Sequence, residues 1–105
     1  MFYSVKARYI PSVLAEFHRK LTDGTILRQR PDGQEIVDSM RRARLTEDGM
    51  VRWSEVRYCS PPLEHERRTV YDHYFNGIET KVEDEYVQFD GQPFMDFLAA
   101  TASRE

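Results

Sequence analysis

The sequence predicts an α+β domain in which an antiparallel sheet carries helices on one of its faces. Two observations lead to this prediction. Residues 2–10 and 50–59 are rich in aromatic and β-branched residues with the period of a strand, and other segments place their apolar residues at helical spacing. With 105 residues, the chain has the length of one hydrophobic core. We therefore expect residues 1–105 to form a single α+β domain.

Composition and charge restrict the possible classes of function. Apolar residues make up 40% of the chain and charged residues 31%, with a net charge of −3, which is typical of a globular protein. Domains that bind nucleic acid are usually clearly basic, so we expect no nucleic-acid partner. The sequence has no apolar run of membrane-helix length, no signal-peptide layout at its start and only one cysteine. We therefore expect a cytoplasmic protein that makes no membrane contact.

The first strand leads into an amphipathic helix. In residues 2–10, every second side chain from Tyr3 onwards is apolar, so this face is expected to meet the core. A helix is expected to begin at Ser12, whose hydroxyl can cap it, and to end near Leu21. Residues 25–30 are then expected to form a short extended segment.

A second helix is expected to begin at Asp32. The Asp32 side chain can cap this helix, and Glu35, three residues later, completes a pair of the capping-box type. The end of the helix is left open by the pattern. Residues 43–46 are either its last turn or a strand that pairs, through the turn 47–49, with the strand at 50–59.

The strand at 50–59 mixes apolar and charged side chains on both of its faces. This pattern predicts that neither face lies in plain solvent, with one face on helices and the other in a dimer interface. The face of the first strand with Phe2, Lys6 and Arg8 supports the same prediction. We therefore expect a homodimer, with Trp53 between the subunits if its face is the shared one.

The part of the chain from residue 60 onwards supplies a helix, a strand and a short terminal helix. Residues 60–62, Ser-Pro-Pro, are a helix-start signal, and residues 76–77, Asn-Gly, suit a left-handed cap at its end. Residues 78–89 are expected to be a strand that is irregular around its acidic residues. Pro93 then opens a short C-terminal helix.

With the hairpin included, the expected elements follow the order βαββαβ with additions. This order resembles the ferredoxin-like fold, also called split βαβ, and in particular the small dimeric α/β-barrel proteins whose sheets pack face to face. The resemblance rests on element order alone. It implies an antiparallel sheet with helices on one face and a homodimer, and it assigns no functional residues, because many activities use this fold.

Several side chains are candidates for a ligand site. The chain holds many aromatic residues with polar tips, and together with nearby cations they are typical of the lining of a small-molecule pocket. We therefore expect a homodimeric small-molecule-binding or accessory protein with an aromatic-lined pocket. The candidate ligand-binding residues are Arg8, His18, Trp53, Arg57, Tyr58 and Cys59.

The alternative is a small cofactor-free enzyme of the isomerase, lyase or monooxygenase type, with His18, Cys59 or a Tyr as its proton carrier. No catalytic residue is assigned, and neither a cofactor nor a metal is expected. A zinc-binding HExxH helix would need a histidine where Thr69 stands. On the same helix, His65 and Asp72 lie two turns apart, too far for a catalytic dyad. A solvated polar face is expected there.

Overall fold

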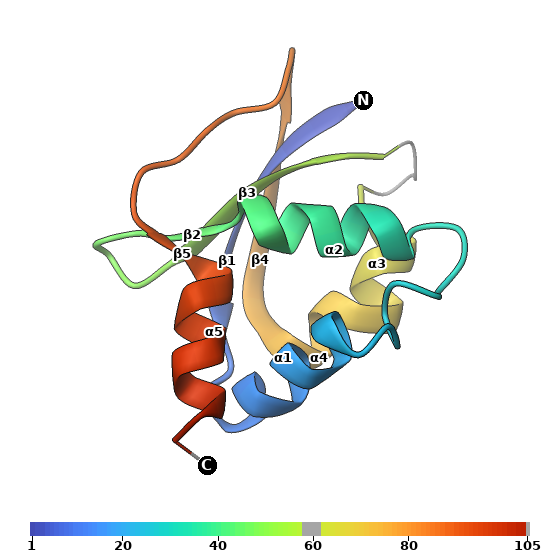
Figure 1. Cartoon of the computed structure of the whole chain (residues 1–105). Helices are drawn as coiled ribbons and strands as arrows, with labels where there is room; N and C mark the ends of the chain where they lie inside the picture. Colours follow the sequence, from blue (N-terminus) through green and yellow to red (C-terminus); the bar gives the residue numbers. More distant parts are fainter. Residues whose placement is uncertain (58–61, 105) are drawn as a thin grey trace.

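The computed structural model describes residues 1–57 and 62–104. Five strands form one sheet in the order β4-β1-β3-β2-β5 with antiparallel pairing, and helices cover one face (Figure 1). This confirms the expected α+β class. The strands are β1 (Phe2–Tyr9), β2 (Arg44–Leu45), β3 (Val51–Val56), β4 (Phe75–Glu83) and β5 (Gln92–Pro93).

The helices vary in length and regularity. A short 3-10 turn, Pro11–Val13, precedes α1. Between α3 and α4 the backbone is π-helical from Arg67 to Tyr71, so the three pieces form one helix, which we call helix 64–74. Within the described chain, every helix is too short or too polar to cross a membrane. The α-helices are α1 (Leu14–Thr22), α2 (Gly33–Arg42), α3 (Glu64–Glu66), α4 (Asp72–Tyr74) and α5 (Phe94–Ala102).

The core lies between the sheet and the helices. The alternation in β1 places Tyr3, Val5 and Ala7 on the buried face, as expected. Val5 pairs with Trp53 of β3, whose side chain is fully buried and contacts the rings of other core aromatics. The placement of Trp53 between subunits is therefore wrong, because the helices already cover its face.

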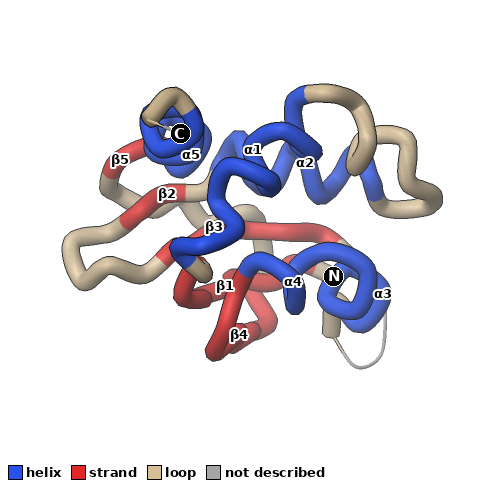
Figure 2. Tube along the Cα trace, turned by 90° about the horizontal axis from the view of Figure 1, so that it is seen from below, coloured by secondary structure: helices blue, strands red, loops and turns tan. Residues whose placement is uncertain are grey.

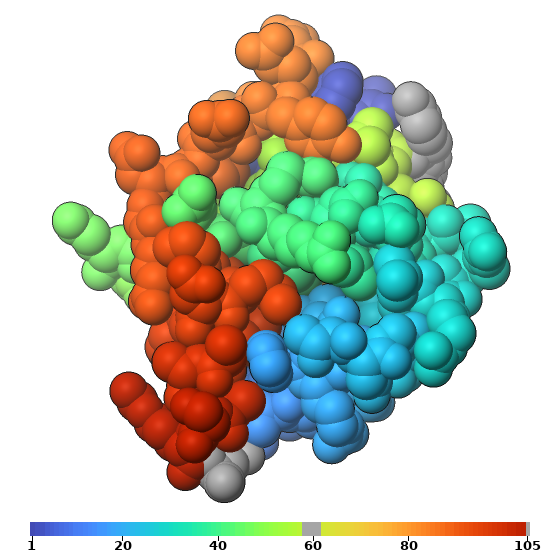
Figure 3. Space-filling view, viewed as in Figure 1, coloured from blue at the N-terminus to red at the C-terminus, as the bar shows by residue number. Residues whose placement is uncertain are grey.

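The opposite face of β3 is partly covered by the chain itself. Ser54 is buried, and its hydroxyl accepts a 2.9 Å hydrogen bond from the backbone N–H of Val87. The ring of Tyr86 packs edge-on against that of Phe2, with 4.9 Å between their centroids. The guanidinium carbon of Arg42 lies over the Tyr86 ring, 4.4 Å from its centroid. In Figure 3 this segment, drawn in orange, lies directly against α2, drawn in green. The mixed pattern of β3 is thus explained without a second subunit.

The hairpin alternative for residues 43–46 is confirmed. β2 pairs with the start of β3, and the Asp48 carboxylate holds the turn by accepting from Thr46, Met50 and Arg52. These hydrogen bonds lower the pKa of Asp48 to about 2. Because β2 has only two residues, the rest of the β3 edge needs other partners.

Glu35 and Arg42 of α2 supply hydrogen-bond partners for backbone groups on that edge. The N–H of Val56 donates to Glu35 Oε2 at 3.0 Å, and Arg42 Nη2 donates to the carbonyl of Ser54 at 2.9 Å. Glu35 and Arg42 also form a 3.0 Å ion pair.

The predicted capping pair of Asp32 and Glu35 is therefore wrong, since neither carboxylate caps α2 by a side-chain hydrogen bond.

The loop between α1 and α2 is compact rather than extended. Residues 25–30 form successive turns, with Arg28 N donating to Gly24 O and Gln29 N donating to Ile26 O. The first turn of α2 lies directly against this loop. A Cβ at Gly33 would lie 2.2 Å from the carbonyl oxygen of Ile26, so only glycine permits the contact. The prediction of an extended segment here is wrong.

Helix 64–74 ends earlier than predicted. Tyr74 is its last residue, and the Asn76-Gly77 pair lies inside β4. Gly77 has a φ of +60° and sits where the register between β1 and β4 shifts by one residue. A glycine at positive φ is typical both of a bulge of the G1 type and of a left-handed helix cap, so the same residue pair fits either structure. The predicted helix start at Ser60 lies outside the described residues.

Candidate functional site

Two segments bring three acid–base side chains together under the first turn of helix 64–74. Asp32 comes from the end of the α1–α2 loop, and His65 and Glu66 come from the helix. One ligand-type atom from each lies within 4.8 Å of the others. The carboxylates of Asp32 and Glu66 are buried, while 28% of the His65 side chain is exposed. We call these three residues the acid–imidazole cluster.

Asp32 is held from two sides. Its Oδ1 accepts a 2.7 Å hydrogen bond from Gln29 Nε2, and its Oδ2 is hydrogen-bonded to Nδ1 of His65. Burial raises the pKa of Asp32, but the hydrogen bonds from His65 and Gln29 outweigh burial and lower it overall. Asp32 is therefore ionised at neutral pH, and it fixes the orientation of the His65 ring.

The pKa of Glu66 is shifted in the opposite direction from that of Asp32. Burial and its hydrogen bond with Asp32 raise the pKa of Glu66 to about 7, although the charge of Arg57 acts to lower it. Arg57 Nε lies 3.3 Å from Glu66 Oε2. The cluster thus combines an ionised carboxylate, an imidazole and a carboxyl group that exchanges its proton near neutral pH, which are the components of acid–base chemistry.

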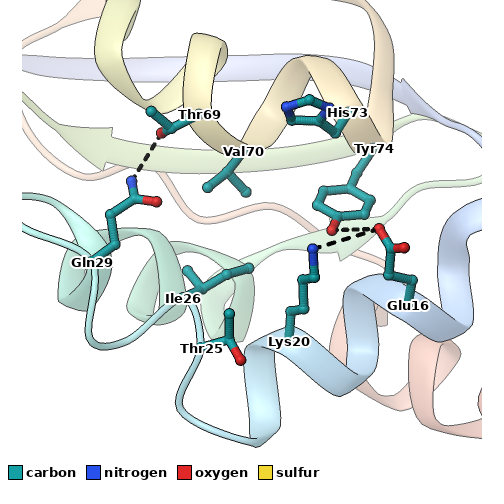
Figure 4. A pocket seen from close by; sticks show the side chains of 9 residues that line it. All are labelled: Glu16, Lys20, Thr25, Ile26, Gln29, Thr69, Val70, His73 and Tyr74. Atoms are coloured by element: carbon teal, nitrogen blue, oxygen red, sulfur yellow. Dashed lines mark hydrogen bonds and ion pairs between the residues drawn. The ribbon is translucent and has the colours of Figure 1, made fainter.

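A pocket of about 230 Å³ lies beside the cluster, between α1, the α1–α2 loop and helix 64–74 (Figure 4). Gln29 joins the two, because its amide nitrogen donates both to Asp32 and, at 2.9 Å, to Thr69 Oγ1 on the pocket wall. Thr69 lies in the π-helical stretch, a feature often found at functional sites. The pocket is lined by Glu16, Lys20, Thr25, Ile26, Gln29, Thr69, Val70, His73 and Tyr74.

Charged and apolar groups face one another across the pocket. Tyr74 OH donates to Glu16 Oε2 at 2.8 Å, and Lys20 Nζ lies 3.9 Å from the same oxygen. Burial and the Glu16 carboxylate raise the pKa of the Tyr74 hydroxyl, which keeps it a donor. Ile26 and Val70 supply the apolar part of the wall. The arrangement suits a small molecule that has both charged and apolar parts.

A third buried acid, Glu55, lies in the core rather than at this site. Its Oε1 accepts hydrogen bonds from Trp53 Nε1 at 2.9 Å and from Tyr71 OH at 2.6 Å. Burial raises the pKa of Glu55 to about 8, although those two hydrogen bonds act to lower it. Glu55 is therefore protonated at neutral pH.

The acid–imidazole cluster is also the group of described residues that could hold a metal ion. Imidazole nitrogen and carboxylate oxygen are donors that Zn²⁺ and Mn²⁺ accept, and three protein ligands is the number found in catalytic zinc sites. Both carboxylates already have protein partners, since Glu66 lies 3.3 Å from Arg57 Nε and Asp32 is hydrogen-bonded to Gln29 and His65.

Of the six predicted ligand residues, the four that the structure describes do not converge on one place. Arg8 is exposed on the face of the sheet opposite Trp53, and His18 lies half-buried on α1, outside the residues that line the pocket. Arg57 contacts Glu66 of the cluster. Tyr58 and Cys59 lie outside the described residues.

The residues that sequence reasoning missed carried a weak signal. Glu55 shares a strand face with Val51 and Trp53, and Glu66 falls on the same helix side as Leu63 and Val70. A carboxylate among apolar neighbours is a mark of a buried acid. By contrast, nothing local ties Asp32 to His65, because 33 residues separate them.

The chain matches no protein-family profile, no curated protein and no solved structure.

Proposed function

We propose that this protein binds a small amphoteric molecule, of the amino-acid class, in the pocket between α1 and helix 64–74. The observation that carries the proposal is the Gln29 amide, which joins a pocket-wall hydroxyl to the buried, ionised Asp32. Glu16 offers an acceptor for an ammonium group, and Lys20 offers a cation for a carboxylate. The volume of about 230 Å³ is below the usual range for drug-sized ligands, which favours a small metabolite.

The proposal retains the accessory role, the homodimer and the cytoplasmic location expected from the sequence. The order of strands, β4-β1-β3-β2, with helices at both crossovers supports a ferredoxin-like arrangement. Tyr74 supplies the aromatic part of the pocket, and its ring stacks on Phe17 at 4.2 Å. The cytoplasmic location rests on the single cysteine of the sequence.

NMR titration of ¹⁵N-labelled protein with a panel of amino acids and their amides tests this function. We expect amide shifts confined to Thr25, Gln29, Thr69 and their neighbours. Thr69→Val should weaken binding at least tenfold. Thr22→Val is its matched control, because both hydroxyls also donate to the carbonyl four residues earlier in a helix. If no compound of the panel shifts these amides, or if both variants bind equally, the proposal is wrong.

A second candidate function is proton transfer on a molecule bound at the exposed edge of His65, which lies outside the residues that line the pocket. The observation that favours it is the buried Asp32 at Nδ1 of the partly exposed His65, which leaves Nε2 to exchange protons. His65 would then take the role of proton carrier that the sequence suggested for His18, Cys59 or a tyrosine. Deuterium incorporation into a bound compound in D₂O tests it. The deuteration should be lost in His65→Gln and kept in His18→Gln, because His18 lies outside the residues that line the pocket.

A further inference from the structure

The two edges of the sheet differ in how they are protected. The β5 edge has only two residues, one of which is Pro93. The β4 edge runs for nine residues, Phe75–Glu83, without a proline. In Figure 2, β4 lies at the margin of the molecule. Beyond the bulge at Gly77, the register of residues 79–83 with β1 is regular, and a regular edge strand is a template for pairing with another strand unless something covers it.

The direction of the backbone groups on β4 follows from the ladder. Met1 O accepts the N–H of Arg57 at 2.9 Å, so odd-numbered residues of β1 turn their N–H and C=O towards β3. Even-numbered residues therefore turn towards β4. Among these, Ser4 pairs with Lys81 and Lys6 pairs with Glu79.

The residues between these pairs point the other way. Because alternate residues of a strand direct their backbone groups to opposite sides, the N–H and C=O of Ile78, Thr80 and Val82 point away from β1. Apart from the ladder itself, none of the backbone hydrogen bonds among the described residues involves these groups. Val82 is also one of the large apolar side chains that is mostly exposed, at 57%.

We infer that β4 pairs antiparallel with β4 of a second copy of this chain, about a two-fold axis at Thr80. In this register Glu79 lies opposite Lys81 of the second copy, and Lys81 lies opposite its Glu79. Ile78 lies opposite Val82 on the other face of the sheet. The Glu79–Lys81 pairs are thus complementary in charge and the Ile78–Val82 pairs join apolar side chains, and opposite charges in such pairs are stabilising.

The two-fold register explains why a second copy is favoured over an unrelated peptide. The strand sequence Ile-Glu-Thr-Lys-Val is complementary to itself when it is reversed about Thr80. Pairing about a two-fold axis also uses the β4 edge of both copies, so the assembly closes as a dimer instead of growing into fibres. This inference rests on the homodimer proposed above and names its surface.

Proline at position 80 tests the backbone part of the inference. Thr80→Pro removes one outward N–H at the two-fold axis and leaves the hydrogen bonds from β4 to β1 in place. We expect the dimer to be lost in sedimentation velocity across a dilution series. Thr80→Val, which keeps the N–H, is the control and should sediment as the wild type.

Charge reversal tests the register. Glu79→Lys and Lys81→Glu each place like charges opposite each other, so each variant alone should be monomeric. An equimolar mixture of the two should form a heterodimer, because each contact then joins opposite charges. The double variant should form a homodimer again. Lack of association in the mixture, or single variants that dimerise as well as the wild type, would overturn the inference.

Hydrogen exchange keeps the test decisive if a variant fails to fold. In wild-type protein, the amides of Ile78, Thr80 and Val82 should exchange more slowly at high concentration than at low concentration. The amides of Glu79 and Lys81 should be protected at both. A dimer that survives all β4 variants would place the interface elsewhere and leave the homodimer standing. Amino-acid titration of the Thr80→Pro monomer shows separately whether the pocket function holds.

Discussion

Glu55 and Glu66 are both buried glutamates, and burial raises the pKa of both, yet their surroundings differ. Glu55 is held by two neutral donors, Trp53 and Tyr71, inside the aromatic core. Glu66 lies among charged groups, beside Arg57 and the ionised Asp32, with the exposed edge of His65 next to it. Burial alone therefore does not mark a functional acid. The contact with the partly exposed imidazole of His65 is what makes Glu66, and not Glu55, a candidate functional acid.

The largest effect is expected from removing the core acid. Glu55→Ala leaves the Trp53 N–H and the Tyr71 hydroxyl without their acceptor and opens a cavity, at a cost of about 2–5 kcal/mol. Glu66→Ala should cost less, about 1–3 kcal/mol, because His65 and Gln29 still hold Asp32. Urea unfolding measures both. A larger loss of unfolding free energy in Glu66→Ala than in Glu55→Ala would mean that Glu66 contributes more to stability than the core acid.

The pH dependence of stability should separate the two glutamates. Between about pH 4.5 and the folded pKa, the unfolded chain has lost the proton that the folded chain keeps, so the free energy of unfolding falls as pH rises. For Glu66 this fall ends at about pH 7, and for Glu55 it ends at about pH 8. Above these values each contribution is constant.

Glutamine replaces each acid by a neutral group of similar shape and removes its contribution. The stability of Glu55→Gln relative to wild type should therefore rise up to about pH 8, whereas that of Glu66→Gln should stop rising at about pH 7. Urea unfolding at a series of pH values measures both curves. Two curves with the same shape would show that the environments do not differ as the structure indicates.

The sequence was sufficient for the elements that depend on periodicity. The alternation of β1 and the apolar stripe of α1 correctly placed Tyr3, Val5 and Leu14 in the core. Predictions from local sequence patterns were wrong where the same residue type is suited to two different structures. Asp32 has the pattern of a helix cap but instead binds His65, and Gly77 has the pattern of a helix end but forms a bulge.

The candidate site was harder to predict, because its parts are distant in sequence. The HExxH pattern draws attention to His65. A partner for His65 was sought on the same helix, but Asp72 of that helix is exposed. The partner comes from the α1–α2 loop, which was expected to be extended. Its compact turns, fixed by contact with Gly33, deliver Asp32 to the helix, and no local pattern encodes that contact.

The smallest effect is expected from divalent metal. The cluster has the donor types for Zn²⁺, but Arg57, Gln29 and His65 already pair with its carboxylates, so we expect neither EDTA nor Zn²⁺ to change the unfolding temperature. A bound ion at about 100 times its dissociation constant would stabilise by about 2.7 kcal/mol, which thermal unfolding detects easily. If Zn²⁺ raises the unfolding temperature of the wild type but not of Asp32→Asn, the cluster is a metal site. In that case the contrast between Glu55 and Glu66 is one between a buried acid and a metal ligand.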